Sequence, residues 1–140
     1  LGEIVQAMRK DFVENHTDPR ALIGQYLDET LPNRLIVKEA TLPNGTLSTQ
    51  ILRAPSRELY VRVERDSSGV SGRVLVSRQH IREWLSERSV NVRDLAKKLE
   101  LEGILVNSGT RRNLGKGTDL DTGQVWCWER ALDGYDEESG

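Results

Sequence analysis

Residues 77–103 read SRQHIREWLSERSVNVRDLAKKLELEG, and this stretch decides the fold that the sequence predicts. Its apolar residues recur at the three- and four-residue spacing of an amphipathic helix, and Ser77 is a good N-cap. A short break at 89–91 separates two such helices. The second helix is predicted over 92–101 and is followed by Gly103, the kind of residue that commonly ends a helix. We therefore predict a helix, a short turn and a second helix.

The residues after this helix pair extend the pattern. Residues 104–106 are predicted to form a short strand, residues 107–123 a polar, glycine-rich loop, and residues 124–129 another strand. The order helix, turn, helix, strand, basic loop and strand is typical of a winged helix-turn-helix. We therefore predict a winged-helix-like segment over 71–130.

The first 70 residues predict a different arrangement. Apolar residues recur at helical spacing in residues 2–15 and again in residues 19–29, which predicts a helical hairpin. Four later stretches have the pattern or the flanking turns of short strands, and we expect them to form a small antiparallel sheet. The whole chain is therefore assigned to the α+β class. The predicted strands are 34–38, 46–53, 58–65 and 73–76.

The alternation of side chains is cleanest in residues 58–65. Because successive side chains of a strand point to opposite faces, we predict that Leu59, Val61 and Val63 share one face. Tyr60, Arg62 and Glu64 are predicted to lie on the other face.

Length and composition indicate a small globular protein. A chain of 140 residues with 36% apolar and 30% charged content can form a single core, and we expect one compact unit. No apolar run reaches the roughly 20 residues of a membrane-spanning helix, and the charged residues 1–15 do not form a signal peptide. Cys127 is the only cysteine, so no internal disulfide is possible. We therefore expect a cytoplasmic protein. Because the chain starts at Leu1, we expect a domain of a larger protein.

The net charge of −2 hides an uneven distribution of charge. Residues 71–117 contain 10 basic and 5 acidic side chains, whereas residues 118–140 contain 1 and 7. We expect the acidic end, 131–140, to be a disordered tail. Because affinity for nucleic acid follows the local charge, the basic segment is the candidate binding region.

Basic side chains occur at both places where a winged helix contacts DNA, the second helix and the loop. We predict that they contact mainly phosphates. Base readout should be slight, because the exposed face of 92–101 has no Asn or Gln. The predicted nucleic-acid-binding residues are Arg93, Lys97 and Lys98 of the helix and Arg111, Arg112 and Lys116 of the loop.

The alternative hypothesis is a protein–protein docking or dimerisation module. In that case the contact surface would consist of apolar residues left exposed on 2–29 or on the strand at 58–63. Such a module would bind without a steep dependence on salt.

Two tryptophans of the last predicted strand leave a related question open. Trp126 and Trp128 point to the same face. Packing over the first helix of the pair is one interpretation. The other is an exposed aromatic surface that stacks on unpaired bases.

The sequence offers little for catalysis, and we expect no enzyme activity, no cofactor and no metal site. His16 and His80 have no sequence reason to meet, and Asp119 and Asp121 lack a third ligand. The run Gly-Lys-Gly-Thr at 115–118 is not a phosphate-binding loop, because a strand is predicted to follow it where such loops require a helix.

Four segments of residues 74–129 resemble a group of known proteins. They are Val-Leu-Val-Ser at 74–77, Gly-Ile-Leu-Val at 103–106, Leu-Gly-Lys-Gly-Thr at 114–118 and Thr-Gly-Gln-Val-Trp-Cys-Trp-Glu at 122–129. They resemble the C-terminal tails of large phage and mobile-element proteins, including primase–helicase-like replication proteins and conjugative relaxase or helicase tails. The resemblance implies an accessory domain attached to an enzyme that acts on DNA elsewhere, and it supplies no catalytic residue.

Overall fold

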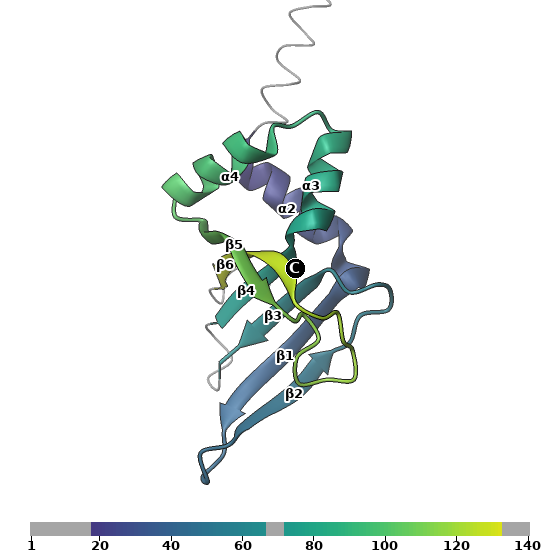
Figure 1. Ribbon diagram of the computed structural model, residues 1–140, viewed down its shortest axis with the longest axis vertical. Coiled ribbons are helices and arrows are strands. Elements are labelled where there is room, and N and C mark those ends of the chain that lie inside the picture. The colour runs from purple at the N-terminus through teal and green to yellow at the C-terminus, as the bar shows by residue number, and fades with distance from the viewer. Residues whose placement is uncertain (1–17, 67–71, 133–140) are drawn as a thin grey trace, which may run out of the picture.

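The computed structural model describes residues 18–66 and 72–132. Figure 1 shows a sheet with the described helices gathered at one end. The helices are α2 (Pro19–Glu29), α3 (Arg78–Glu87) and α4 (Val92–Leu101), and a short 3-10 helix, η1 (Leu31–Asn33), follows α2. The strands are β1 (Arg34–Thr41), β2 (Leu47–Arg53), β3 (Val61–Arg65), β4 (Gly72–Ser77), β5 (Leu105–Arg112) and β6 (Val125–Leu132).

All six described strands belong to one sheet, in the order β2-β1-β3-β4-β6-β5. The neighbours β1 and β3 are parallel and the other neighbours are antiparallel, so the sheet is mixed and not antiparallel throughout as predicted. Helices together with this sheet confirm the α+β class. Within the described ranges, every helix is too short or too polar to cross a lipid bilayer.

The segment 71–130 does not form a clear, separate winged helix-turn-helix. Its first strand, β4, pairs with β3 on one side and with β6 on the other, so its strands continue the sheet begun by the first half of the chain. The strand predicted at 104–106 is longer than expected, because β5 extends to Arg112 and pairs with β6. The boundary expected near residue 70 therefore falls between two strands that pair directly.

The boundaries predicted for the helix pair are confirmed in α3 and α4. Ser77 Oγ accepts a hydrogen bond from the His80 N–H at 3.4 Å, and Asn91 Oδ1 accepts one from the Asp94 N–H at 3.1 Å. Both side chains satisfy amides that the start of a helix leaves unpaired. Gly103 follows α4 with a φ of 75°, a left-handed conformation that glycine adopts without strain.

The predicted helix over 19–29 is α2. Asp18 caps it, because Asp18 Oδ1 accepts a hydrogen bond from the Arg20 N–H at 3.2 Å. The predicted helix over 2–15 lies outside the described residues, so the predicted hairpin is represented by α2 alone. The predicted tail begins inside β6, which ends at Leu132, and the rest of that tail also lies outside the described residues.

The main core lies between the three helices and one face of the sheet. Buried apolar residues of α2, α3 and α4 pack there against β3, β4, β5 and β6. The Trp84 and Tyr26 rings contact each other edge to face, with centroids 5.4 Å apart, a favoured arrangement for aromatic pairs. Burial of this face explains why each described helix carries an apolar stripe.

The opposite face of the sheet is covered by the loop of residues 113–124, which joins β5 to β6. Leu114 of this loop is 1% exposed and packs with Leu35, Leu75 and Cys127 in a second apolar cluster. The polar loop predicted at 107–123 is shorter than expected, because residues 107–112 belong to β5. The remaining loop is folded back onto the sheet, which removes Leu114 from water.

Arg62 of β3 holds this loop in place. Its side chain is fully buried, and its Nη1 donates hydrogen bonds to the carbonyl oxygens of Leu114 and Lys116 at 2.9 and 2.8 Å. Its Nε donates to Glu64 Oε2 at 2.5 Å, and Arg73 Nε donates to the other oxygen of Glu64 at 2.6 Å. The polar face predicted for residues 58–65 is therefore a buried ion network under the loop.

We expect Arg62→Ala to lower the free energy of unfolding by about 3–5 kcal/mol, because removing one partner leaves Glu64 buried with reduced compensation. Urea denaturation at neutral pH measures the change. The control is Arg57→Ala, which truncates an exposed arginine and should shift stability by less than about 0.5 kcal/mol. Equal effects of the two substitutions would contradict this role of Arg62.

Stability should also fall in acid through Glu64. Burial disfavours its charge, but hydrogen bonds from Arg73 and Arg62 outweigh burial and hold the pKa of Glu64 below its ordinary value. Because the pKa of Glu64 is lower in the folded state than in the unfolded state, ionised Glu64 stabilises the fold. This contribution is complete above the unfolded pKa of about 4.3 and is lost as the pH falls through the folded pKa. Urea titrations between pH 2 and pH 6 should therefore show a steeper acid loss for the native protein than for Glu64→Gln. Parallel curves would show that Glu64 does not contribute.

Candidate nucleic-acid interface

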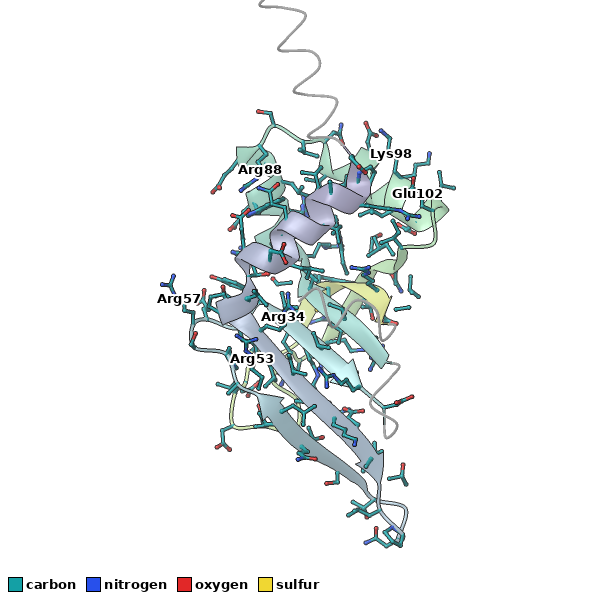
Figure 2. All side chains as sticks on the ribbon, turned by 180° about the vertical axis from the view of Figure 1, so that it is seen from behind. Arg34, Arg53, Arg57, Arg88, Lys98 and Glu102 are labelled. Atoms are coloured by element: carbon teal, nitrogen blue, oxygen red, sulfur yellow. The ribbon has the colours of Figure 1, made fainter. Side chains whose placement is uncertain are left out.

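The predicted binding residues of the helix pair are exposed on α4. Arg93, Lys97 and Lys98 lie on the side of α4 that faces away from the core. Figure 2 shows Lys98 close to Glu102 on this helix, and Glu102 makes an ion pair with Arg20 at 3.9 Å. The α4 surface therefore carries both signs of charge.

The two arginines predicted to lie in the loop are on β5, and they point to opposite faces of the sheet. Arg111 pairs with Trp126 and faces the helix side, whereas Arg112 pairs with Val125 and faces the loop side. Arg111 is six residues beyond the start of β5, which corresponds to roughly 20 Å of strand. Because α4 is joined to the start of β5, its cations and Arg111 are at different ends of this strand.

Lys116, the last predicted residue, lies in the loop over the other face. Its carbonyl oxygen accepts the hydrogen bond from Arg62, and the next residue, Gly117, lies against Thr49 of β2. The structure therefore does not gather the six predicted residues on one surface. Folding the loop back onto the sheet separates Lys116 from the helices, and the alternation of side chains along β5 turns Arg112 away from them.

The two tryptophans of β6 differ in their environment. Trp128 is 2% exposed and belongs to the main core, which confirms packing for this residue. Trp126 is 48% exposed on the same face. The Arg78 guanidinium carbon is 4.9 Å from the centroid of the Trp126 ring, and the guanidinium carbon of Arg111 is 5.5 Å from it. Both distances are within the range of a cation–π interaction.

Trp126 forms one end of an open groove of about 920 Å³ between α3 and the start of β6. Arg78 reaches this groove from the first turn of α3. Its guanidinium lies beside Gly109, where an added Cβ would be 3.6 Å from Arg78 Nη1. Farther along α3 the groove carries Arg82 and the acidic residues Glu83 and Glu87. The positive charge is therefore concentrated at the tryptophan. The remaining lining residues are Ser77, Gln79, Ser86, Gln124 and Val125.

Sequence reasoning missed Arg78 as a site residue. It is the first residue of α3, and the sequence places it 33 residues from Arg111 and 48 from Trp126. The useful observation would have been that β4 precedes α3 directly and pairs with β6, because Ser77 pairs with Cys127. This pairing places the start of α3 beside the start of β6.

A second cationic group, also missed, lies where α2 ends. Figure 2 shows Arg34, Arg53 and Arg57 on one flank of the molecule. Arg34 is 7% exposed and its Nη2 donates to the Leu27 carbonyl oxygen at 2.6 Å. Burial lowers the pKa of Arg34, and the charge of Arg53 lowers it further although Asp28 acts in the opposite direction. Arg34 is therefore a buried member of this group, whereas Arg53 and Arg57 are exposed.

The His80 ring is held by contacts with two tyrosines. Its ring stacks on Tyr60 with centroids 3.6 Å apart, and its Nδ1 is 2.8 Å from the Tyr26 hydroxyl. Glu58 accepts a hydrogen bond from the Tyr60 hydroxyl. Tyr26 is 54 residues from His80, so sequence reasoning did not identify this partner.

Asp121 and Cys127, two other side chains that could carry chemistry, also have structural surroundings that explain them. Asp121 Oδ1 accepts hydrogen bonds from the Asn113 amide and the Gly123 N–H, both at 2.8 Å. Burial raises the pKa of the Cys127 thiol to about 11, so it remains protonated at neutral pH. No group of three or more metal-ligating side chains is found in residues 18–66 and 72–132.

Comparisons with known proteins give no family for this chain. No family model matches it, and neither does any curated protein or solved structure. The groove beside Trp126 is therefore interpreted from its own geometry.

The environment of His80 predicts a pKa below the ordinary value of a histidine. Burial lowers the pKa of His80, although Glu83, Glu58 and Glu87 act in the opposite direction. A folded pKa below the unfolded value of about 6.5 means that unfolding takes up a proton, so stability decreases as the pH falls below about 6.5 towards the folded pKa. An NMR titration should give a midpoint below 6.5 for His80, and Tyr60→Ala should raise it by exposing the ring. A midpoint at or above 6.5 would contradict burial as the dominant cause.

Proposed function

We propose that this chain is a non-catalytic accessory domain that binds single-stranded nucleic acid at the groove beside Trp126. The observation that carries the proposal is a half-exposed indole ring flanked by two guanidinium groups. Trp126 would stack on an unpaired base, and Arg78 and Arg111 would contact the phosphates beside that base.

The chemistry of the three side chains suits this role. Every base has an aromatic face, so stacking on an indole tolerates any sequence and contributes about 1–3 kcal/mol per base. Guanidinium groups donate several hydrogen bonds in one plane and bind phosphate oxygens in pairs. Arginine also stacks on aromatic rings, so Arg78 and Arg111 can hold the indole in place before a base arrives.

A single strand fits the groove better than a duplex does. Reading a duplex through a winged helix requires a basic helix and a basic loop to face the same groove of DNA. Here Lys97 lies on α4, whereas Lys116 lies in the loop on the other face of the sheet. A base in a duplex is also stacked between its neighbours, so it is not available to Trp126.

The wider role of the domain is proposed from the sequence. The resemblance of residues 74–129 to the tails of mobile-element proteins supports an accessory domain in a larger, cytoplasmic DNA-processing protein. Such a domain would hold the strand while another domain acts on it. Binding should be sensitive to salt, because phosphate contacts release counterions.

Trp126→Ala should weaken binding of a labelled single-stranded oligonucleotide by roughly 5- to 150-fold, the equivalent of losing about 1–3 kcal/mol of stacking. Fluorescence anisotropy at low salt measures the affinity, and quenching of indole emission reports contact with the base. Replacing Arg78 and Arg111 together by Gln should also lower the dependence of affinity on salt.

The matched control is the double variant Arg93→Ala and Lys97→Ala on α4, which should leave the affinity within about twofold because each charge lies away from the groove. Loss of affinity in this control but not in Trp126→Ala would instead support the helix-pair interpretation. Absence of any binding at low salt would overturn the proposed function.

A further inference from the structure

The edge strand β2 is unusually apolar for an edge exposed to water. Five of its seven residues are exposed, and Leu47, Ile51 and Leu52 are 65%, 47% and 42% exposed. Only Arg53, at its end, carries a charge, and β2 has no proline. β1 pairs with one side of β2, and within the described sheet no strand pairs with the other. Natural sheets usually protect such an edge with charges, prolines or bulges, because it can pair with another strand.

β2 has one register shift, at Leu52, because Ile51 pairs with Val37 and Arg53 with Ile36, whereas Leu47 to Ile51 pair with β1 without interruption. The other edge of the sheet, β5, is less regular. The pairing of β5 with β6 shifts register twice, between Leu105 and Asn107 and again between Asn107 and Thr110. β5 also ends in two arginines, Arg111 and Arg112. Bulges and charges of this kind make an edge unsuitable for further pairing. A partner strand is therefore expected at β2.

The sequence of β2 is complementary to itself. Placing a second copy antiparallel with the two-fold axis at Thr49 sets Leu47 opposite Ile51 of the second copy, and Ile51 opposite Leu47. Thr49 then meets Thr49 of the second copy. Apolar pairs and Thr–Thr pairs are favourable when directly opposite across two strands.

The same alignment is acceptable for charge. Arg53 falls opposite Gly45 of the second copy, in the turn before β2, so the two Arg53 side chains do not meet. An axis at Gln50 would instead place Arg53 opposite Leu47 and leave Ile51 opposite Thr49, which loses both apolar pairs. The axis at Thr49 is therefore preferred.

We propose that two copies of this chain associate through antiparallel pairing of β2 with β2, with the two-fold axis at Thr49. The two six-stranded sheets would form one continuous sheet. The contact uses the same strand in both copies, so it closes after two copies. Because a single strand pair buries less surface than a standard interface, the dimer should be weak and depend on protein concentration.

The first test is cross-linking. Thr49→Cys should form a disulfide between chains under mild oxidation, because cysteines on a two-fold axis fall within disulfide distance. Gln50→Cys is the matched control for register, because the two cysteines would then be diagonal and not opposite. The native Cys127 is fully buried and should not react. Faster cross-linking of Gln50→Cys than of Thr49→Cys would overturn the proposed axis.

The second test is sedimentation equilibrium of the native chain and of Ile51→Lys. The native chain should dimerise with rising concentration, whereas a lysine facing Leu47 of the second copy should keep the variant monomeric. Monomer alone at about 1 mM native protein, or larger open assemblies, would overturn the proposal. Trp126→Ala should dimerise like the native chain, so failure of dimerisation and failure of nucleic-acid binding are separate results.

Discussion

The buried guanidinium of Arg62 constrains the whole arrangement. An ionised group inside a protein must be paired and hydrogen-bonded, because water no longer solvates it. Glu64 supplies the opposite charge, and the carbonyl oxygens of Leu114 and Lys116 accept from Nη1. These two carbonyls are available only when the loop of residues 113–124 lies on the sheet. The buried charge on β3 therefore requires the loop, some 50 residues later in the chain, to lie on the sheet.

The position of that loop determines which surfaces remain for binding. Once the loop covers one face of the sheet, its lysine is on the side away from the helices. Trp126 and Arg111 stay on the helix side, where the first turn of α3 brings Arg78 to the indole. The candidate interface consequently consists of one helix end and two strands, and the basic loop that suggested nucleic-acid binding contributes only Arg111, which lies on a strand.

Local features of the sequence predicted the parts of the fold that depend on neighbouring residues. Ser77 and Asn91 mark the starts of helices through contacts with residues a few positions away, and Gly103 marks an end through its backbone conformation. The bounds of α3 and α4 agree with these signals. The alternation at 58–65 also assigned the side chains of 61–64 to the correct faces of β3. It was wrong for Leu59 and Tyr60, which precede β3 and pack on the opposite faces from those predicted. It could not show that the polar face is buried, because the partners of Arg62 are distant in sequence. The length of β5 was missed because its register shifts interrupt the alternation that identifies a strand.

For the site, the sequence identified Arg111 and the possibility of stacking. It could not separate Trp126 from Trp128, because the core residues that bury Trp128 are distant from it in sequence.

The two proposed contacts lie toward opposite edges of the same sheet. β2 contributes no residue to the lining of the groove beside Trp126, so pairing along β2 does not use the residues of the groove. A dimer through β2 would carry two such grooves, one in each copy. A single stacked base gives a weak site, but two linked sites on one strand raise the affinity through effective concentration without any new contact. This gain requires a strand long enough to reach both grooves, so the binding of short oligonucleotides should not depend on dimerisation, whereas the binding of long ones should.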